Sequence, residues 1–248
     1  MKKIVVFFVS ISICFLSLNA QTVDEIISKY HESIGGLDKL KAHTSVKAIG
    51  KAPTPQGDFP FVFYQEKPNK MKVVIDIMGQ KMVAQAYDGE TAWMLNPFMG
   101  ETAQKLPAEQ AKSVMNEAEL EDPFIDYAAK GHEVSLEGTE DVQGIQCYKV
   151  KLTKFKGNAE RESTQYYYFD KENYIPIMVK TVVKVGDQPG QEVETYFSDY
   201  QEVNGGLVMP FTMEVKMAGQ VVQSMVFDSI FINVDIPDEE FKFPEEEE

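Results

Sequence analysis

The 248-residue sequence is poor in cysteine, tryptophan, histidine and arginine. It has two cysteines, one tryptophan and three histidines, and Arg161 is its only arginine. Cys14 lies in the N-terminal apolar run, which leaves Cys147 alone in the body of the chain, so no internal disulfide is expected there. Cys147 stands in the apolar run Ile145 to Tyr148, which predicts a buried and unreactive thiol.

Positive charge is also scarce. The chain has 24 basic residues against 39 acidic ones, a formal net charge of −15. That charge would repel the phosphates of nucleic acids and of anionic lipid surfaces, so nucleic-acid binding is excluded as a function. The last four residues, 245–248, are all glutamates and are expected to form a solvated acidic tail.

Catalytic motifs are missing as well. The sequence contains no Gly-x-Ser-x-Gly elbow, no His-Glu-x-x-His, no phosphate-binding glycine loop and no paired cysteines. His31, His43 and His132 are widely separated and are expected at the surface rather than in a metal site. The sequence therefore predicts no catalytic residue, no metal and no cofactor. An enzyme remains a third alternative, because catalytic groups can assemble from distant positions.

The first twenty residues have the order of a secretory signal. Lys2 and Lys3 precede an apolar run from Ile4 to Leu18, and Ala20 follows as a small residue. The run is shorter than the roughly 20 residues of a membrane-spanning helix. We expect cleavage after Ala20, with a retained membrane anchor as the alternative; Ile13 before Cys14 argues against lipid attachment.

The chain after residue 20 opens with a strong helix pattern. Thr22 and Glu25 form a capping box, an apolar stripe runs from Val23 to Ile34, and Gly35-Gly36 follows. These features predict a helix, and a short second turn is expected at Leu37 to Ala42.

From Ser45 onward the apolar residues alternate with period two, which predicts strands. Phe59, Phe61 and Phe63 share one face of a strand, and Met82, Ala84 and Ala86 are expected to do so on another. Asp88-Gly89, 186–190 and Asn204-Gly205-Gly206 are turn signals. Strands are expected again at 132–142, 145–154, 163–170, 175–185, 192–203, 207–217 and 221–232.

A helical insertion is predicted at residues 107–130, between two runs of strands. Pro107 suits the first turn of a helix, and Asp122-Pro123 would begin a second short one. We therefore expect a mainly β fold with helices (α+β): about ten or eleven antiparallel strands in one domain, 21–244. So large a sheet must curl around either a filled core or a cavity covered by helices.

Four stretches together resemble a known family, the LolA-like lipoprotein carriers in the form of the outer-membrane lipoprotein-sorting proteins of Bacteroidetes. They are Ile26 to Gly36, Tyr87-Asp88-Gly89 with Trp93, Phe169-Asp170 with Ile175-Pro176, and Tyr200 to Pro210 with Ile236-Pro237-Asp238 and Phe241. The resemblance implies a half-open antiparallel β-barrel with a helical lid.

The resemblance also implies a periplasmic protein that binds the acyl chains of lipoproteins or other lipids, between an inner-membrane donor and an outer-membrane acceptor. We expect it to act as a monomer. In the family's carriers an arginine helps to control the lid, but Arg161 lies in a polar stretch, 156–162, that does not match that position.

Soft apolar side chains are abundant: the sequence contains twelve methionines, many of them in the expected strands. The residues expected to line the lipid cavity are Phe61, Phe63, Met71, Met82, Trp93, Phe211, Met213 and Met225. A change of strand register would exchange several of them for their neighbours. The alternative is a periplasmic protein-interaction or sensor module with a filled core on the same fold and without transport activity.

Overall fold

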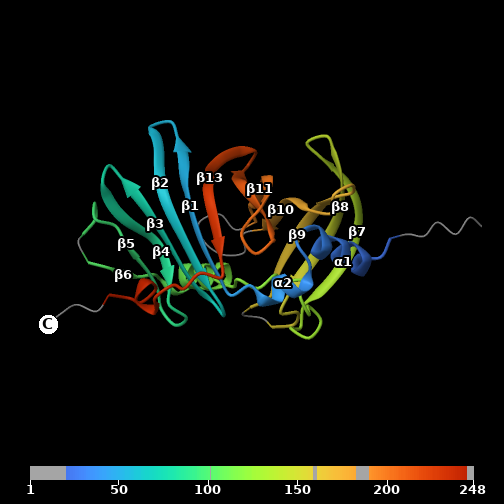
Figure 1. Cartoon of the computed structure of the whole chain (residues 1–248), viewed down its shortest axis with the longest axis horizontal. Helices are drawn as coiled ribbons and strands as arrows, with labels where there is room; N and C mark the ends of the chain where they lie inside the picture. The colour runs from blue at the N-terminus through green and yellow to red at the C-terminus, as the bar shows by residue number, and fades with distance from the viewer. Residues whose placement is uncertain (1–20, 101, 159–160, 183–189, 245–248) are drawn as a thin grey trace, which may run out of the picture.

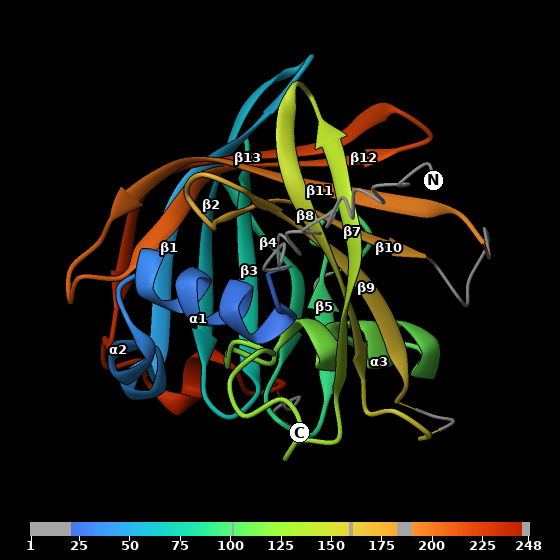
Figure 2. The same ribbon diagram turned by 90° about the vertical axis from the view of Figure 1, so that its right-hand side faces the viewer.

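The structure is a computed structural model that describes residues 21–100, 102–158, 161–182 and 190–244. The expected signal at 1–20, residues 183–189 of the expected strand and turn at 175–190, and the acidic tail at 245–248 lie outside the described residues. Within them, the chain forms mainly β-structure with a few short helices (Figures 1 and 2).

All thirteen described strands belong to one antiparallel sheet in the order β6-β5-β4-β3-β2-β1-β13-β12-β11-β10-β9-β8-β7. Their bounds are β1 Ser45–Thr54, β2 Gly57–Glu66, β3 Lys70–Ile77, β4 Gln80–Tyr87, β5 Ala92–Leu95, β6 Gln104–Lys105, β7 Glu133–Val142, β8 Ile145–Lys154, β9 Ser163–Asp170, β10 Pro176–Val182, β11 Glu192–Glu202, β12 Val208–Met217 and β13 Gln220–Ile232.

The antiparallel prediction is confirmed, but ten or eleven strands was too low a number. One strand, β6, is only two residues long, too short for a period-two pattern to reveal it. The two edge strands, β6 and β7, do not pair with each other, so the sheet stays open. Its curvature nevertheless surrounds α1 and α3 (Figure 2).

The topology explains why the helical insertion covers the sheet. Strands β1 to β6 form one run of neighbouring strands, β7 to β13 form another, and pairing of β1 with β13 joins the two runs. Strands β6 and β7 follow each other in sequence but lie at opposite edges of the sheet. The chain between them, which contains α3 (Ala108–Glu117), must therefore cross from one edge to the other.

The first helix, α1 (Val23–Ser33), forms as the sequence predicts. Thr22 is its N-cap, and the capping box with Glu25 is complete. Gly35, just after the helix, has φ +117°, and a Cβ there would lie 2.3 Å from the carbonyl oxygen of Gly206. The chain therefore needs glycine both for its conformation and for the close approach to the β11–β12 turn. Helix α2 (Leu37–Ala42) follows, also as expected.

Two local predictions were wrong. The segment 122–131 forms hydrogen-bonded turns rather than a second short helix; Asp126 has φ +48° within it, which interrupts a helix. In β4 an irregularity in the pairing with β3 lies between Val73 and Val74, so that Met82 pairs with Ile75 and Ala86 pairs with Lys72. Such an irregularity shifts the alternation, so Met82 and Ala86 face opposite sides.

The C-terminal segment packs on the other side of the sheet from α3. It contains a short 3-10 helix, Asp238–Glu240, and Phe241 is fully buried. The indole N–H of Trp93 donates a hydrogen bond of 2.9 Å to the carbonyl oxygen of Phe241. The ammonium of Lys72 reaches Glu240 at 3.2 Å, so this segment is held by both apolar and ionic contacts.

Candidate functional site

The inner face of the sheet, the one that the helices cover, has no charged side chain on its five central strands. The register of β3, β2, β1, β13 and β12 places these apolar and amide residues on it: Met71, Val73, Ile75, Ile77, Phe59, Phe61, Phe63, Gln65, Val46, Ala48, Gly50, Ala52, Met225, Phe227, Ile230, Ile232, Met209, Phe211, Met213 and Val215. The outer positions of the same strands hold lysines and carboxylates: Lys47, Lys51, Lys70, Lys72, Asp76, Glu214 and Lys216. The two faces of this part of the sheet therefore have opposite character.

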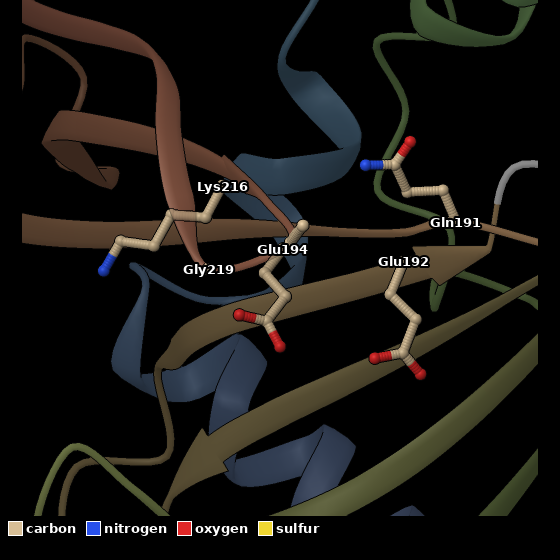
Figure 3. Close-up of a pocket in the computed structure, with 6 residues that line it drawn as sticks. Gln191, Glu192, Glu194, Lys216 and Gly219 are labelled. Carbon is tan, nitrogen blue, oxygen red and sulfur yellow. The ribbon is translucent and has the colours of Figure 1, made fainter. Parts of the chain in front are cut away.

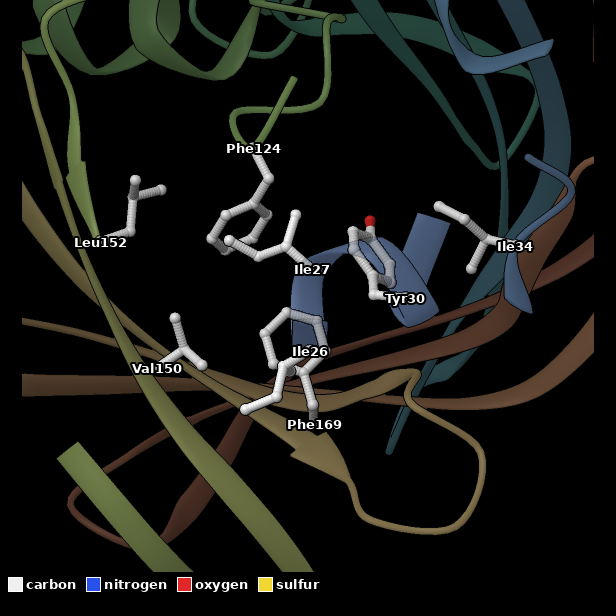
Figure 4. Close-up of a cluster of buried hydrophobic side chains, with 8 residues drawn as sticks. All are labelled: Ile26, Ile27, Tyr30, Ile34, Phe124, Val150, Leu152 and Phe169. Atoms are coloured by element: carbon white, nitrogen blue, oxygen red, sulfur yellow. The ribbon is translucent and has the colours of Figure 1, made fainter. Parts of the chain in front are cut away.

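Helix α1 covers the inner face over β8 and β9. Its buried side chains Ile26, Ile27, Tyr30 and Ile34 pack with Phe124, Val150, Leu152 and Phe169 (Figure 4). Tyr30 makes a tilted ring contact with Phe169, with 5.1 Å between centroids. This half of the inner face is filled by the chain's own side chains.

Helix α3 covers the opposite half. Val114 and Ala118 are buried against Met71, Tyr87 and Ala92 of β3, β4 and β5. Leu120, just beyond this helix, and Leu40 of α2 pack against the cluster formed by β1, β12 and β13. The helices and the chain between them thus lie along the end of the sheet where β2 meets β3 and β4 meets β5.

None of the described helices packs on the rest of the inner face. Ile75, Ile77, Met82, Met213 and Met225 lie toward the opposite ends of their strands and are half-buried. None of them belongs to a core cluster with a helix. A charge-free, half-buried apolar surface next to the helices is therefore the part of the described chain best suited to hold an apolar ligand.

The structure places seven of the eight expected lining residues on this face. Phe61, Phe63, Met71, Met82, Phe211, Met213 and Met225 all lie at inner positions. Trp93 does not: it pairs with Ala86, is 2 % exposed, and packs on the outer face against Phe243. The irregular pairing of β4 places it there, and no sequence pattern marks that irregularity.

Polar contacts tie the chain after α3 to α1. The phenol of Tyr30 donates a hydrogen bond of 2.6 Å to Asp122, and a ring nitrogen of His31 lies 3.5 Å from the same carboxylate. Burial, together with the negative charge of Asp122, holds the pKa of Tyr30 well above its usual value. The sequence analysis did not single out Asp122, because its partners lie about ninety positions away.

Further ion pairs and hydrogen bonds hold the same segment. Lys41 lies 2.9 Å from Asp126, and Tyr127 donates a hydrogen bond of 2.8 Å to Asp24. On the sheet side, the amide of Gln65 donates a hydrogen bond of 2.9 Å to the carbonyl oxygen of Glu117. We call residues 117–131 the cover segment.

A hollow with a volume of about 400 Å³ lies at the outer face near the β12–β13 turn. It is lined by Gln191, Glu192, Glu194, Lys216, Ala218 and Gly219, whose labelled side chains do not converge on one point (Figure 3). Glu194 already accepts a hydrogen bond of 2.9 Å from Tyr196 and lies 3.2 Å from Lys180. The hollow therefore lacks a set of groups aimed at a ligand.

The sequence predicted that the histidines lie at the surface, and this prediction was wrong. His31, His43 and His132 are each less than a tenth exposed, and each has a polar partner. His43 contacts the carbonyl oxygen of Ser45 at 3.1 Å, and His132 accepts a hydrogen bond of 3.1 Å from the amide of Phe155. Within the described ranges, no three histidine, cysteine or acidic residues form a group that could hold a metal ion.

Arg161 is exposed, and its guanidinium lies 3.7 Å from the ring centroid of Phe155. This stacking contact is local to the β8–β9 connection and does not involve the cover segment. In the part of the chain that the structure describes, no helix combines the length and apolar character needed to cross a membrane.

A family model described as an uncharacterized protein-like family matches residues 71–244. No curated protein matches the chain.

Several solved structures are similar in fold. One is a DUF1329 family protein from Desulfovibrio piger, 16% identical, covering 90% of this chain and 98% of its own, with a TM-score of 0.57. A second is a LolA superfamily protein from Nitrosomonas europaea, which is 15% identical. The match covers 90% of this chain and 98% of that protein, with a TM-score of 0.57. A third is a putative outer membrane lipoprotein-sorting protein domain from Vibrio parahaemolyticus, which is 12% identical. The match covers 88% of this chain and 94% of that domain, with a TM-score of 0.54. At these identities the likeness concerns the fold.

Proposed function

Because this chain belongs to the uncharacterized protein-like family and has a LolA-like fold, we propose from its inner face that it binds the acyl chains of lipids or lipoproteins. The proposed setting is the periplasm, and the proposed role is that of a carrier in outer-membrane lipoprotein sorting, without catalytic activity. The observation that carries the proposal is the charge-free inner face of β1, β2, β3, β12 and β13, half-buried where no helix covers it.

The energetics fit a carrier rather than a tight receptor. Each buried methylene contributes about 0.8 kcal/mol, so a long acyl chain gains on the order of 12 kcal/mol on leaving water. The same chain gains as much in a membrane, so a carrier must offer an environment close to that of lipid. Methionines and phenylalanines of an open face supply contacts that adapt to the chain.

A protein-interaction or sensor module without transport is the second candidate. The observation that favours it is the filled cluster beneath α1, where Tyr30, Phe124 and Phe169 leave that part of the inner face to the chain's own side chains. The two candidates differ on one point: the carrier takes up an acyl chain on the inner face, and the module does not.

The test uses the protein isolated from cells that express the full sequence. Native mass spectrometry with lipid extraction is expected to show a bound phospholipid or acylated peptide, and a fluorescent fatty acid is expected to be taken up. Met225→Gln on the inner face should weaken uptake several-fold. Val226→Gln is the matched control, because Val226 is the next residue, pairs with Thr212 and faces outward.

A protein that carries no lipid and takes up no fatty acid would overturn the proposal and favour the interaction module. Equal losses of fatty-acid uptake in Met225→Gln and Val226→Gln would show that lipid binding does not depend on the inner face.

A further inference from the structure

The most exposed large apolar side chains of the described chain gather at one end of the sheet. Five such residues are more than half exposed: Met78 at 95%, Met99 at 75%, Phe98 at 58%, Val222 at 56% and Val221 at 52%. All five lie in or beside the turns that follow β3, β5 and β12. The other exposed large apolar residues have values of 37–42%.

The sheet topology places these turns at one end of the sheet. In the sheet order β6-β5-β4-β3-β2-β1-β13-β12, the connections β5–β6, β3–β4, β1–β2 and β12–β13 all fall at the same end. The ends of β1, β2 and β3 that carry such turns project from the body of the molecule in the upper left of Figure 1. We call residues 78–81, 96–100 and 218–222 the apolar tips.

The described apolar tips carry no carboxylate, although the chain has 39 acidic residues. Besides the five apolar residues they consist of alanine, glycine, proline, asparagine, glutamine and one lysine, Lys81. The nearby Asp76 is turned toward its own hairpin and accepts a hydrogen bond of 2.7 Å from the amide of Gly79. Other carboxylates at this end are paired with lysines. Asp58 of the β1–β2 hairpin lies 2.9 Å from Lys51, and Glu192 and Glu194, beside Gly219, lie 3.1 and 3.2 Å from Lys180.

The separation of the apolar tips favours a deformable partner over a rigid protein surface. Hairpins next to each other in the sheet are two strands apart, which sets the separation of 96–100 from 78–81 at roughly 10 Å. The β1–β2 hairpin lies between 78–81 and 218–222, so these two tips are four strands, roughly 20 Å, apart. Separate protrusions of this kind do not form the continuous, closely packed patch that a protein interface needs. A bilayer interface can take up each protruding side chain independently.

We propose that this end of the molecule docks on the surface of a zwitterionic phospholipid bilayer through Met78, Phe98, Met99, Val221 and Val222. The net charge of −15 opposes docking on strongly anionic membranes, so the neutral surface is preferred. The inference goes beyond acyl-chain binding, since it concerns the turns and not the inner face. Docking at this end would also bring the uncovered part of the inner face next to the lipid.

The test is flotation of the purified protein with phosphatidylcholine vesicles. The unaltered protein is expected to float with the vesicles, and a Met78→Asp, Met99→Asp double variant to lose at least tenfold in partition coefficient. The matched control is Leu37→Asp with Phe231→Asp. Both of these residues are apolar and 41% exposed, and they lie in α2 and at the other end of β13. The control is expected to stay within twofold of the unaltered protein.

Absence of vesicle binding by the unaltered protein, or equal binding by the tip variant, would overturn the proposal. So would an equal loss in the control, since that would show a nonspecific effect of added charge. Fatty-acid uptake, measured in parallel, should be the same in all three proteins. If the unaltered protein bound vesicles but took up no fatty acid, the docking proposal would stand and the function proposed for the inner face would fail.

Discussion

The phenol of Tyr30 and the carboxylate of Asp122 form a hydrogen bond of 2.6 Å that joins α1 to the cover segment. Tyr30 is buried, and Asp122 also accepts a hydrogen bond of 2.8 Å from the amide of Phe124. One carboxylate therefore fixes both the turn in which it lies and the helix beside it.

Tyr30→Phe is expected to loosen this junction. A hydrogen bond to a charged partner contributes about 1.5–3 kcal/mol, and its loss should lower the free energy of unfolding by that amount. Amide exchange should speed up in residues 117–131. Tyr127→Phe is the control, because its hydrogen bond to Asp24 is exposed and should contribute less; a larger effect from Tyr127 would contradict the role given to Asp122.

Gly35→Ala is expected to be far more damaging than Gly36→Ala. Both glycines have φ near or above +100°, a conformation that side-chain-bearing residues rarely adopt, so each alanine costs about 1–3 kcal/mol in backbone strain. At Gly35 the added Cβ also meets the carbonyl oxygen of Gly206 at 2.3 Å, whereas at Gly36 it meets nothing within 4 Å. Urea unfolding should show at least twice the loss for Gly35→Ala; equal losses would show that the close approach carries no cost.

Trp93→Phe should leave fatty-acid uptake unchanged, since Trp93 lies on the outer face. The lost hydrogen bond to Phe241 should cost about 0.5–1.5 kcal/mol and free the C-terminal segment. Limited proteolysis after residue 235 should therefore become faster. A several-fold loss of uptake would return Trp93 to the ligand site.

Affinity for single-chain amphiphiles should follow chain length rather than headgroup. Each added methylene should tighten binding about fourfold, the equivalent of about 0.8 kcal/mol. Because the inner face of the central strands holds no charge, sulfate, trimethylammonium and sugar headgroups should differ little in about 1 M salt, where screening acts over about 3 Å. A strong headgroup preference in displacement titrations would reveal a charged contact on the ligand's path.

Cys147 should resist alkylation until the protein unfolds. It is fully buried, and burial raises the pKa of its thiol to about 11. An unfolded thiol ionises near pH ~8.5, so the stability from the neutral buried form is complete below that pH and is lost as the pH rises toward about 11. Cys147→Ala should remove this part of the alkaline pH dependence. Rapid iodoacetamide labelling of the native protein at pH 9 would contradict the prediction.

Local patterns account for most of the strands and for α1. The capping box at Thr22 and the alternation of Phe59, Phe61 and Phe63 involve neighbours in sequence, whose geometry the backbone fixes. Where the alternation broke, at the irregular pairing of β4, the prediction placed Trp93 on the wrong face. The two-residue β6 and the turns at 122–131 left no periodic signal to read.

The sequence by itself determined an acidic chain of alternating strands opened by a capped helix, because composition and short-range periodicity are local properties. Only the tertiary structure decided that β1 pairs with β13, and that the chain from β6 to β7 crosses the sheet and meets Tyr30 at Asp122. The tertiary structure also decided which turns lie at the same end of the sheet. These relationships join residues far apart in sequence, and they arise from the pairing of whole strands, which no single segment encodes.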